Sequence, residues 1–433
     1  MSTDFTLDHS HKSYPFHQGP MLASALAGKA WNVLADDLSF PLAVIRDDAL
    51  AHNLAWMQSF AERKGVWLAP HGKTPMSPQL CQRQLAAGAW GLSFATVFQA
   101  RMGVAAGARR IIIANQVLAD ADLDGLSALL SADAALRVWF LVDSLAQLAL
   151  IEDWAQRRGA GHAFDVLLEM GITGQRTGCR NSSQALALAR ALAQSKAVRL
   201  GGIECYEGGL ATCDSAHDSA AVTELVRRVM DVVQACQRES LWNLAAGDEV
   251  IISAGGSAVF DLVIPLLQAR LEGGPPGPAA PPVRGVLRSG CYLTHDHGNY
   301  RRFLAQIEKR EGLDSSLQAA LCVWSLVQSV PEPGLALLTC GRRDISYDQQ
   351  MPIPTLFAAK GQRQAVSVPE GWKISALNDQ HAYLRFDPAE DAVQVGDRVA
   401  LGISHPCTTF DKWRWMPLVD SNWTLTGAIS TAF

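Results

Sequence analysis

The sequence predicts an α/β fold, a (β/α)8 TIM-type barrel followed by an antiparallel β domain, and three observations favour it. Short apolar runs alternate with Ala- and Leu-rich segments of helical period between residues 41 and 290. Such continuous runs are typical of parallel strands that are buried on both faces. No G-x-G-x-x-G turn follows the first run, which disfavours an open doubly wound sheet. After about residue 320, short strand-like runs separated by turn residues replace the alternation.

Nine runs have the character of buried strands, one more than an eight-stranded barrel needs. They cover residues 41–46, 65–70, 90–95, 110–115, 138–143, 164–170, 199–206, 249–255 and 283–290. Segments with helical period lie between them, for example 49–65 and 220–239. The Pro-rich segment 272–285 precedes the last run, and we expect it to be a surface excursion of the barrel.

The late runs predict the β domain and complete the domain plan. They lie at residues 335–346, 381–388, 393–404 and 423–431. We expect an N-terminal segment (1–40) that packs on the β domain, a barrel (41–310) that binds the cofactor, and a C-terminal β domain (311–433).

Composition and charge favour small-molecule chemistry in the cytoplasm. The chain is 48% hydrophobic and 18% charged, and its net charge is −5, without a run of Lys or Arg that would indicate nucleic-acid binding. No apolar run is long enough to cross a membrane, and the N-terminus does not resemble a signal peptide. The nine scattered cysteines indicate reduced thiols.

Two features of the predicted barrel mouth indicate a bound aldehyde cofactor with a phosphate. Chemistry in such barrels lies at the carboxyl ends of the strands, where Lys73 follows the second run in "WLAPHGKTPM". Gly255, Gly256 and Ser257 follow a late run, and adjacent glycines let backbone N–H groups approach an anion. A lysine that can condense with an aldehyde, beside a phosphate site, suggests pyridoxal phosphate. Lys73 merely closing a strand, and an ordinary tight turn at the glycines, are the alternatives.

A possible metal pair lies in "GISHPCTTFDKW", where His405 and Cys407 are two residues apart. On an extended strand these side chains face the same side, and imidazole with thiolate is a zinc-like pair. Substrate or water would have to complete the coordination. A packed histidine beside a buried cysteine is the alternative interpretation.

The motifs "PHGKTP", "GQRTG", "CYEGG", "SAGGS", "SGCYLTHD" and "HPC" occur in an order and spacing that resemble the D-serine dehydratase and D-threonine aldolase family. These are fold-type III pyridoxal phosphate enzymes built like alanine racemase, with a barrel and a β domain. The resemblance extends from about residue 30 to about residue 425.

The resemblance implies roles for individual residues. Lys73 would form the Schiff base and take the α-proton, Arg176 would lie near the phenolic oxygen of the cofactor, and Tyr206 would contact its ring nitrogen. The phosphate would be held by the glycine loop, with Cys291 and Tyr292 nearby. The family also implies a head-to-tail homodimer.

The metal pair separates the branches of this family. His405 and Cys407 match its zinc pair, and His-x-Cys rather than His-x-Asp favours the dehydratase branch. We therefore expect a zinc-assisted dehydratase that converts a D-3-hydroxy amino acid, such as D-serine or D-threonine, to a 2-oxo acid and ammonia. A D-threonine aldolase is the alternative reaction, and a pyridoxal phosphate-binding protein without turnover is the alternative of another class. A racemase would need a second base that the sequence does not place.

Overall fold

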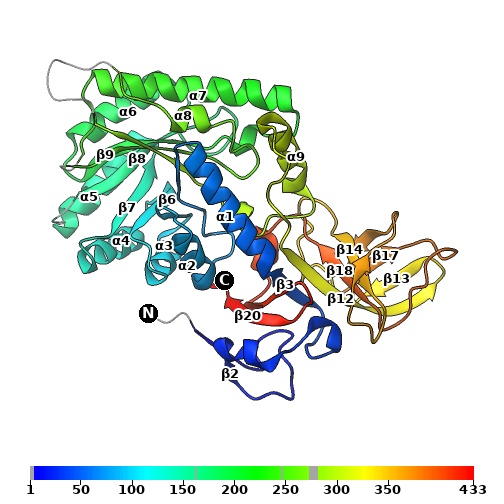
Figure 1. Cartoon of the computed structure of the whole chain (residues 1–433). Coiled ribbons are helices and arrows are strands. Elements are labelled where there is room, and N and C mark those ends of the chain that lie inside the picture. Colours follow the sequence, from blue (N-terminus) through cyan, green and yellow to red (C-terminus); the bar gives the residue numbers. More distant parts are fainter. Residues whose placement is uncertain (1–3, 160, 162, 245–246, 273–280) are drawn as a thin grey trace. The chain divides into compact units, whose positions relative to one another are not determined.

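The computed structural model describes residues 4–159, 161, 163–244, 247–272 and 281–433 (Figure 1). It divides into two compact units, which we describe separately. The first comprises residues 1–57, 74–80 and 291–433, and the second comprises residues 58–73 and 81–290. These units are not the contiguous segments 1–40, 41–310 and 311–433 of the predicted plan. Most of the predicted surface excursion at 272–285 lies outside the described residues.

The second unit contains an eight-stranded parallel sheet in the order β4-β11-β10-β9-β8-β7-β6-β5. Its strands are β4 (Trp67–Leu68), β5 (Leu92–Phe94), β6 (Arg110–Gln116), β7 (Arg137–Val142), β8 (Phe164–Met170), β9 (Val198–Cys205), β10 (Val250–Ala254) and β11 (Val283–Leu287). Just beyond β4, the N–H of Gly72 donates to the carbonyl of Ser93 (2.7 Å), and the N–H of Ser93 donates to Pro70 (2.9 Å). These bonds join the two end strands, so the sheet closes into a barrel. The predicted fold class is confirmed.

Helices alternate with the strands and lie outside them (Figure 1). They are α1 (Asp47–Arg63), α2 (Pro78–Ala86), α3 (Val97–Ala105), α4 (Asp120–Ala132), α5 (Leu145–Arg158), α6 (Ser182–Gln194), α7 (Ser215–Arg238) and α8 (Ile264–Leu267), of which α1 and α2 begin in the first unit. Side-chain caps mark several starts: Thr96, Ser144, Asn181 and Asp214 each accept a hydrogen bond from a first-turn N–H of α3, α5, α6 and α7. Apolar side chains fill the barrel interior, among them Trp90, Trp139, Ile251 and Val286.

The first unit contains the antiparallel β domain. Its large sheet has the order β15-β14-β18-β12-β13-β17-β16, and β3, β19 and β20 pair beside it. The strands are β3 (Leu42–Arg46), β12 (Leu321–Glu332), β13 (Leu335–Leu338), β14 (Ile353–Ala358), β15 (Val366–Ser367), β16 (Lys373–Leu377), β17 (Ala382–Arg385), β18 (Arg398–Gly402), β19 (Trp415–Val419) and β20 (Leu425–Ser430). This unit also holds the short pair β1 (Thr6–Leu7) and β2 (Met21–Leu22), the helices α9 (Asn299–Glu311) and α10 (Cys407–Phe410), and the 3-10 turn η4 (Cys291–Leu293).

One of the nine predicted apolar runs is not a barrel strand. It is the first run along the chain, which contains β3. β3 pairs with β12 antiparallel and with β19 parallel, and so belongs to the β domain rather than to the barrel. Residues of the N-terminal segment share the core of this unit: Leu7, Leu26 and Val33 pack in one buried cluster with Trp324 and Trp415.

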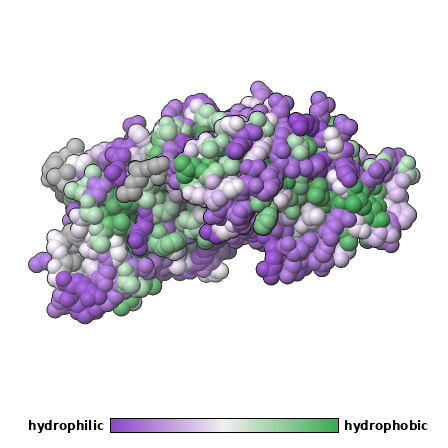
Figure 2. Space-filling view, turned by 90° about the horizontal axis from the view of Figure 1, so that it is seen from below, coloured by the Kyte–Doolittle hydropathy of each residue, from purple (hydrophilic) through white to green (hydrophobic). Residues whose placement is uncertain are grey.

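No helix within the described ranges is long and apolar enough to cross a lipid bilayer. On the face shown in Figure 2, hydrophilic and hydrophobic residues are interspersed.

Candidate active site

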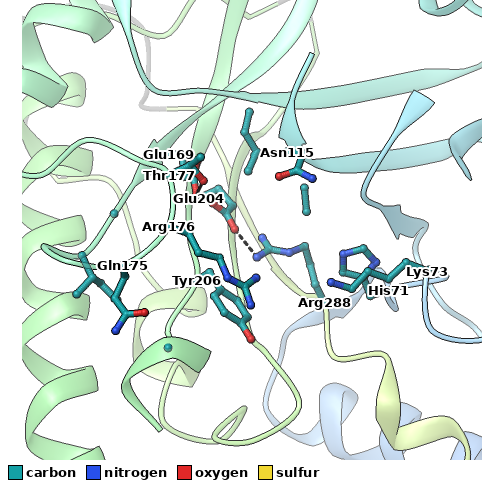
Figure 3. Close-up of a pocket in the computed structure, with 15 residues that line it drawn as sticks. His71, Lys73, Asn115, Glu169, Gln175, Arg176, Thr177, Glu204, Tyr206 and Arg288 are labelled. Carbon is teal, nitrogen blue, oxygen red and sulfur yellow. Dashed lines mark hydrogen bonds and ion pairs between the residues drawn. The ribbon is translucent and has the colours of Figure 1, made fainter. Parts of the chain in front are cut away.

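A cavity of about 670 Å³, part of it open to solvent, lies in the second unit where the barrel strands end (Figure 3). Three of the predicted site residues line it: Lys73, Arg176 and Tyr206. The other lining residues that carry polar side chains are His71, Asn115, Glu169, Gln175, Thr177, Glu204 and Arg288. The side chains labelled in Figure 3 reach this space from the loops or ends that follow several different strands, as expected for a barrel active site.

Lys73 follows β4 through a turn that packs tightly on β5. A Cβ atom at Gly72 would lie 2.3 Å from the ring of Phe94, so only glycine permits this approach. His71 precedes Gly72. Burial and the charges of Lys73 and Arg288 hold the pKa of His71 well below its usual value. His71 is therefore neutral, and its buried Nδ1 has no hydrogen-bond partner within the described part of the chain.

Arg288 and Glu204 form a buried ion pair on the cavity wall (Figure 3). Arg288, which follows β11, also donates to Ser253 Oγ on β10 (2.9 Å) and to the carbonyl of Cys205 (3.3 Å). Burial raises the pKa of Glu204, and the guanidinium opposes that rise. One carboxylate oxygen of Glu204 (Oε2) is buried without a hydrogen-bond partner among the described residues. Sequence reasoning missed this pair, although a charged residue at the end of a buried apolar run was a usable signal.

Arg176 and Tyr206 lie against each other. The guanidinium of Arg176 stands 4.9 Å from the centre of the Tyr206 ring. The neighbouring Thr177 donates to Glu169 (2.9 Å), which also accepts from Gln116 (2.5 Å), so the loop that carries Arg176 is tied to the end of β8. Burial raises the pKa of Glu169.

Two glycines pack closely against Tyr206. A Cβ atom at Gly208 would lie 2.2 Å from the Tyr206 hydroxyl, and one at Gly256 would lie 3.0 Å from its ring. Glycine at both positions therefore lets the backbone pack directly against Tyr206 and holds this side chain in place.

The glycine loop predicted to hold phosphate already carries an anion from the protein. The N–H groups of Gly255 and Gly256 donate to the two carboxylate oxygens of Glu207 at 3.1 and 2.6 Å. Gly255 has φ of +104°, a conformation that favours glycine. The loop thus presents N–H groups to an anion as predicted, but in this structure that anion is Glu207. The assignment of Gly255, Gly256 and Ser257 to phosphate stays a prediction.

The residues at the cavity fit pyridoxal phosphate. Lys73 provides an amine, and Arg176 and Arg288 provide positive charge, around one cavity. The unpartnered buried atoms His71 Nδ1 and Glu204 Oε2 belong to lining residues, so a polar ligand there would satisfy them.

The predicted metal pair lies in the first unit, but not on a strand. β18 ends at Gly402, His405 lies in the following turn, and Cys407 begins α10. The expectation that both lie on one face of an extended strand is wrong, because Pro406 between them adopts a helical conformation (φ −58°, ψ −46°).

His405 is nevertheless oriented as a metal-binding histidine usually is. Its Nδ1 lies 2.6 Å from Asp348 Oδ2, and Thr408 donates to the other oxygen of that carboxylate at 2.6 Å. Burial raises the pKa of Asp348, but the hydrogen bonds from Thr408 and His405 outweigh it and lower that pKa overall. The donor chemistry of His405 and Cys407 fits zinc, although no three His, Cys, Asp or Glu side chains in the described ranges are grouped so as to hold a metal ion.

Cys291 and Tyr292, predicted to lie near the phosphate, form the buried turn η4 of the first unit. Cys291 Sγ lies 3.8 Å from Cys407 Sγ, and this hydrogen bond, together with burial, raises the pKa of Cys291 well above its usual value. Their role toward the phosphate stays a prediction.

Comparison with known proteins agrees with this architecture. The family model described as "Alanine racemase, N-terminal domain" matches residues 45–263, which are 219 of the 433 residues. The model described as "Putative serine dehydratase domain" matches residues 320–419.

Relatives match over most of their length. A D-threonine aldolase from Arthrobacter sp. is 28% identical over 359 residues, 83% of each chain. D-threo-3-hydroxyaspartate dehydratase from Delftia sp. (strain HT23) is 27% identical over 383 residues, 86% of this chain and 92% of that one.

Two solved structures share the fold. The crystal structure of D-threonine aldolase from Filomicrobium marinum matches with a TM-score of 0.73 and 22% identity, over 91% of this chain and 95% of that one. A cysteine-to-alanine mutant of D-threo-3-hydroxyaspartate dehydratase, in the metal-free form, matches with a TM-score of 0.67 and 24% identity, over 93% and 99%.

Proposed function

The chain belongs to the alanine-racemase-like, fold-type III pyridoxal phosphate family of D-serine dehydratases and D-threonine aldolases, and we propose that it is a zinc-assisted dehydratase of a D-3-hydroxy amino acid. Its products would be a 2-oxo acid and ammonia. That it is a pyridoxal phosphate-dependent lyase agrees with the relatives that it matches over most of its length, which are named as aldolases and dehydratases. A carrier of the cofactor without turnover is thereby disfavoured.

One observation carries the proposal: Lys73 lines the same cavity as Arg176 and Tyr206. Pyridoxal phosphate, when bound, supplies an electron sink for the charge left at the α-carbon of the substrate. Lys73 would hold the cofactor covalently before turnover, and its freed amine would take the α-proton. Arg176 would lie toward the phenolic oxygen, and Tyr206 toward the ring nitrogen. Because the pKa of His71 lies well below its usual value, its imidazole is a weak base and does not compete with the Lys73 amine for that proton.

His405 and Cys407 would hold the zinc ion, whose Lewis acidity helps a hydroxide leave from the β-carbon. Asp348 would fix the ring of His405 so that Nε2 is the free nitrogen.

Aldol cleavage to glycine and an aldehyde is the second candidate, because two of the matched proteins are D-threonine aldolases. It would use the same residues but would remove the proton of the β-hydroxyl instead of expelling hydroxide. Cys407 favours dehydration, since the family's aldolase branch tends to carry Asp at this position.

Product analysis tests the proposal. The protein would be supplied in turn with D-serine, D-threonine and D-threo-3-hydroxyaspartate, and ammonia, 2-oxo acid, glycine and aldehyde would be assayed together. We expect equal amounts of ammonia and 2-oxo acid, and Lys73→Ala should lose both the products and the visible absorbance of the bound cofactor. Glycine with an aldehyde would assign the chain to the aldolase branch. A Lys73→Ala variant with unchanged turnover would refute the role of Lys73.

A further inference from the structure

Two thiols and a hydroxyl meet in the first unit, from three distant parts of the chain. Cys407 Sγ lies 3.8 Å from Cys291 Sγ and 3.3 Å from Thr74 Oγ1, and Thr74 Oγ1 lies 3.7 Å from Cys291 Sγ. Cys291 is only 5% exposed, so the sequence and the fold place a second thiol in a protected position beside the predicted metal ligand.

The spacing of the two sulfur atoms is informative. Two thiolates bound to one zinc ion at about 2.3 Å, at the tetrahedral angle, are about 3.8 Å apart. A disulfide would require about 2.05 Å. The 3.8 Å separation of Cys291 and Cys407 is that of a thiol–thiol hydrogen bond, and it also matches two thiolates on one metal ion, so both sulfur atoms could bind a metal without moving apart.

We propose that Cys291 supplies a second thiolate to the metal ion that His405 and Cys407 bind. This inference rests on the metal part of the proposed function. Binding of a divalent cation would release one proton from each thiol, so that two metal–sulfur bonds replace two S–H bonds. Thr74 would remain outside the coordination shell and donate its hydroxyl hydrogen to a thiolate.

A second thiolate would change both the metal selectivity and the Lewis acidity of the site. Soft thiolates select zinc over manganese and magnesium, which prefer oxygen ligands. The added negative charge also weakens the metal as a Lewis acid. With three protein ligands, a fourth position stays open for water or the substrate hydroxyl, which is the arrangement of catalytic zinc sites. In this structure His405 is held by Asp348 and is not yet grouped with both thiols, so the thiol pair is the preformed part.

X-ray absorption at the zinc edge tests the proposal directly, because it counts sulfur neighbours. The full chain, loaded with pyridoxal phosphate and one equivalent of zinc, is expected to show two sulfur atoms at about 2.3 Å. Cys291→Ala and Cys291→Ser should each show one, and their zinc dissociation constants should rise at least roughly tenfold. Cys322→Ala, at another buried cysteine of the same unit, should keep two sulfur atoms and the original affinity.

The outcomes separate this inference from the proposed function. One sulfur neighbour in the unaltered protein, unchanged in Cys291→Ala, would overturn the inference and leave the His405 and Cys407 pair in place. Ammonia release by a protein that binds no zinc would overturn the metal part of the function as well. The number of sulfur neighbours of zinc is measured on the unaltered protein, so misfolding of a variant would not prevent this test of the inference.

Discussion

At the scale of single residues, Glu207 is the clearest case of a side chain whose role follows from its contacts. It is fully buried, and it accepts the N–H groups of Gly255 and Gly256. Burial raises the pKa of Glu207, and these hydrogen bonds oppose that rise. Glu207 therefore fixes the loop that is predicted to hold the phosphate, while the residue before it, Tyr206, lines the cavity.

Replacing Glu207 should affect the phosphate group of the cofactor selectively. Losing charge-assisted bonds of about 1.5–3 kcal/mol from the loop would weaken pyridoxal phosphate binding in Glu207→Gln by roughly tenfold to a hundredfold. Pyridoxal, which lacks the phosphate, serves as the matched ligand, and its affinity should change little. Both dissociation constants can be measured by fluorescence titration. Tighter binding of pyridoxal phosphate would mean instead that Glu207 competes with the phosphate.

The pair Arg288 and Glu204 gives a stability prediction. Arg288→Ala would leave Glu204 buried without its partner and should cost up to about 3–5 kcal/mol, the cost being largest well above pH 8, where the carboxyl is least able to bind a proton. The double change Arg288→Met, Glu204→Leu removes both charges and should cost much less than the single change. Urea unfolding of the three proteins would measure the free energies. If the double variant loses as much as Arg288→Ala, the unpaired charge is not the cause.

At the scale of elements, Asp296 holds the start of α9. Its Oδ1 accepts the N–H groups of Gly298 and Tyr300, both at 3.0 Å. Burial nevertheless raises the pKa of Asp296 to about 7, against 3.8 in the unfolded chain. The folded state therefore binds a proton more readily than the unfolded state, and the associated stability is present below pH 3.8 and is lost as the pH rises through about 7.

Asp296→Asn keeps the accepting Oδ1 but cannot ionise. Relative to this variant, the unaltered protein should lose roughly 1–4 kcal/mol of unfolding free energy between about pH 4 and pH 7. Denaturant unfolding at several pH values would measure the difference. Parallel pH profiles for the two proteins would show that the carboxyl group is not responsible.

The elements also show how far the sequence could predict the fold and the site. The barrel strands were visible as apolar runs, since burial on both faces leaves no polar alternation. The same argument could not exclude β3 from the barrel, because a strand buried in the β domain has the same appearance. The sequence pattern places His405 and Cys407 on a strand, although Pro406 stands between them and Pro favours the start of a helix. Lys73, Arg176 and Tyr206 were found from motifs, whereas Arg288, Glu204 and the contact of Cys291 with Cys407 depend on which strands and turns meet in space.

At the scale of the whole molecule, neither compact unit is a continuous stretch of chain. The predicted barrel segment, residues 41–310, contains β3 but neither β12 nor β19, its pairing partners. Expressed alone, this fragment should expose the buried side chains of β3 and should be insoluble or lack cooperative unfolding. Calorimetry of the fragment and of the full chain would show this. A fragment with a sharp transition like that of the full chain would mean that the barrel folds without the other unit.

The homodimer that the family resemblance implies is a separate prediction. Light scattering after size-exclusion chromatography should give about twice the 46.7 kDa of one chain. If the protein were a monomer and active at the same dilution, the active site would need no residue of a partner subunit.

The pairing of β3 also affects how the protein is made. Residues 42–46 leave the ribosome early, but their partner strands β12 and β19 end only at residues 332 and 419. At about 5–20 residues per second, this apolar segment of the nascent chain waits on the order of half a minute before both of its neighbouring strands exist. During that interval it is a natural binding site for chaperones, and slower translation of the last hundred residues should increase aggregation rather than relieve it.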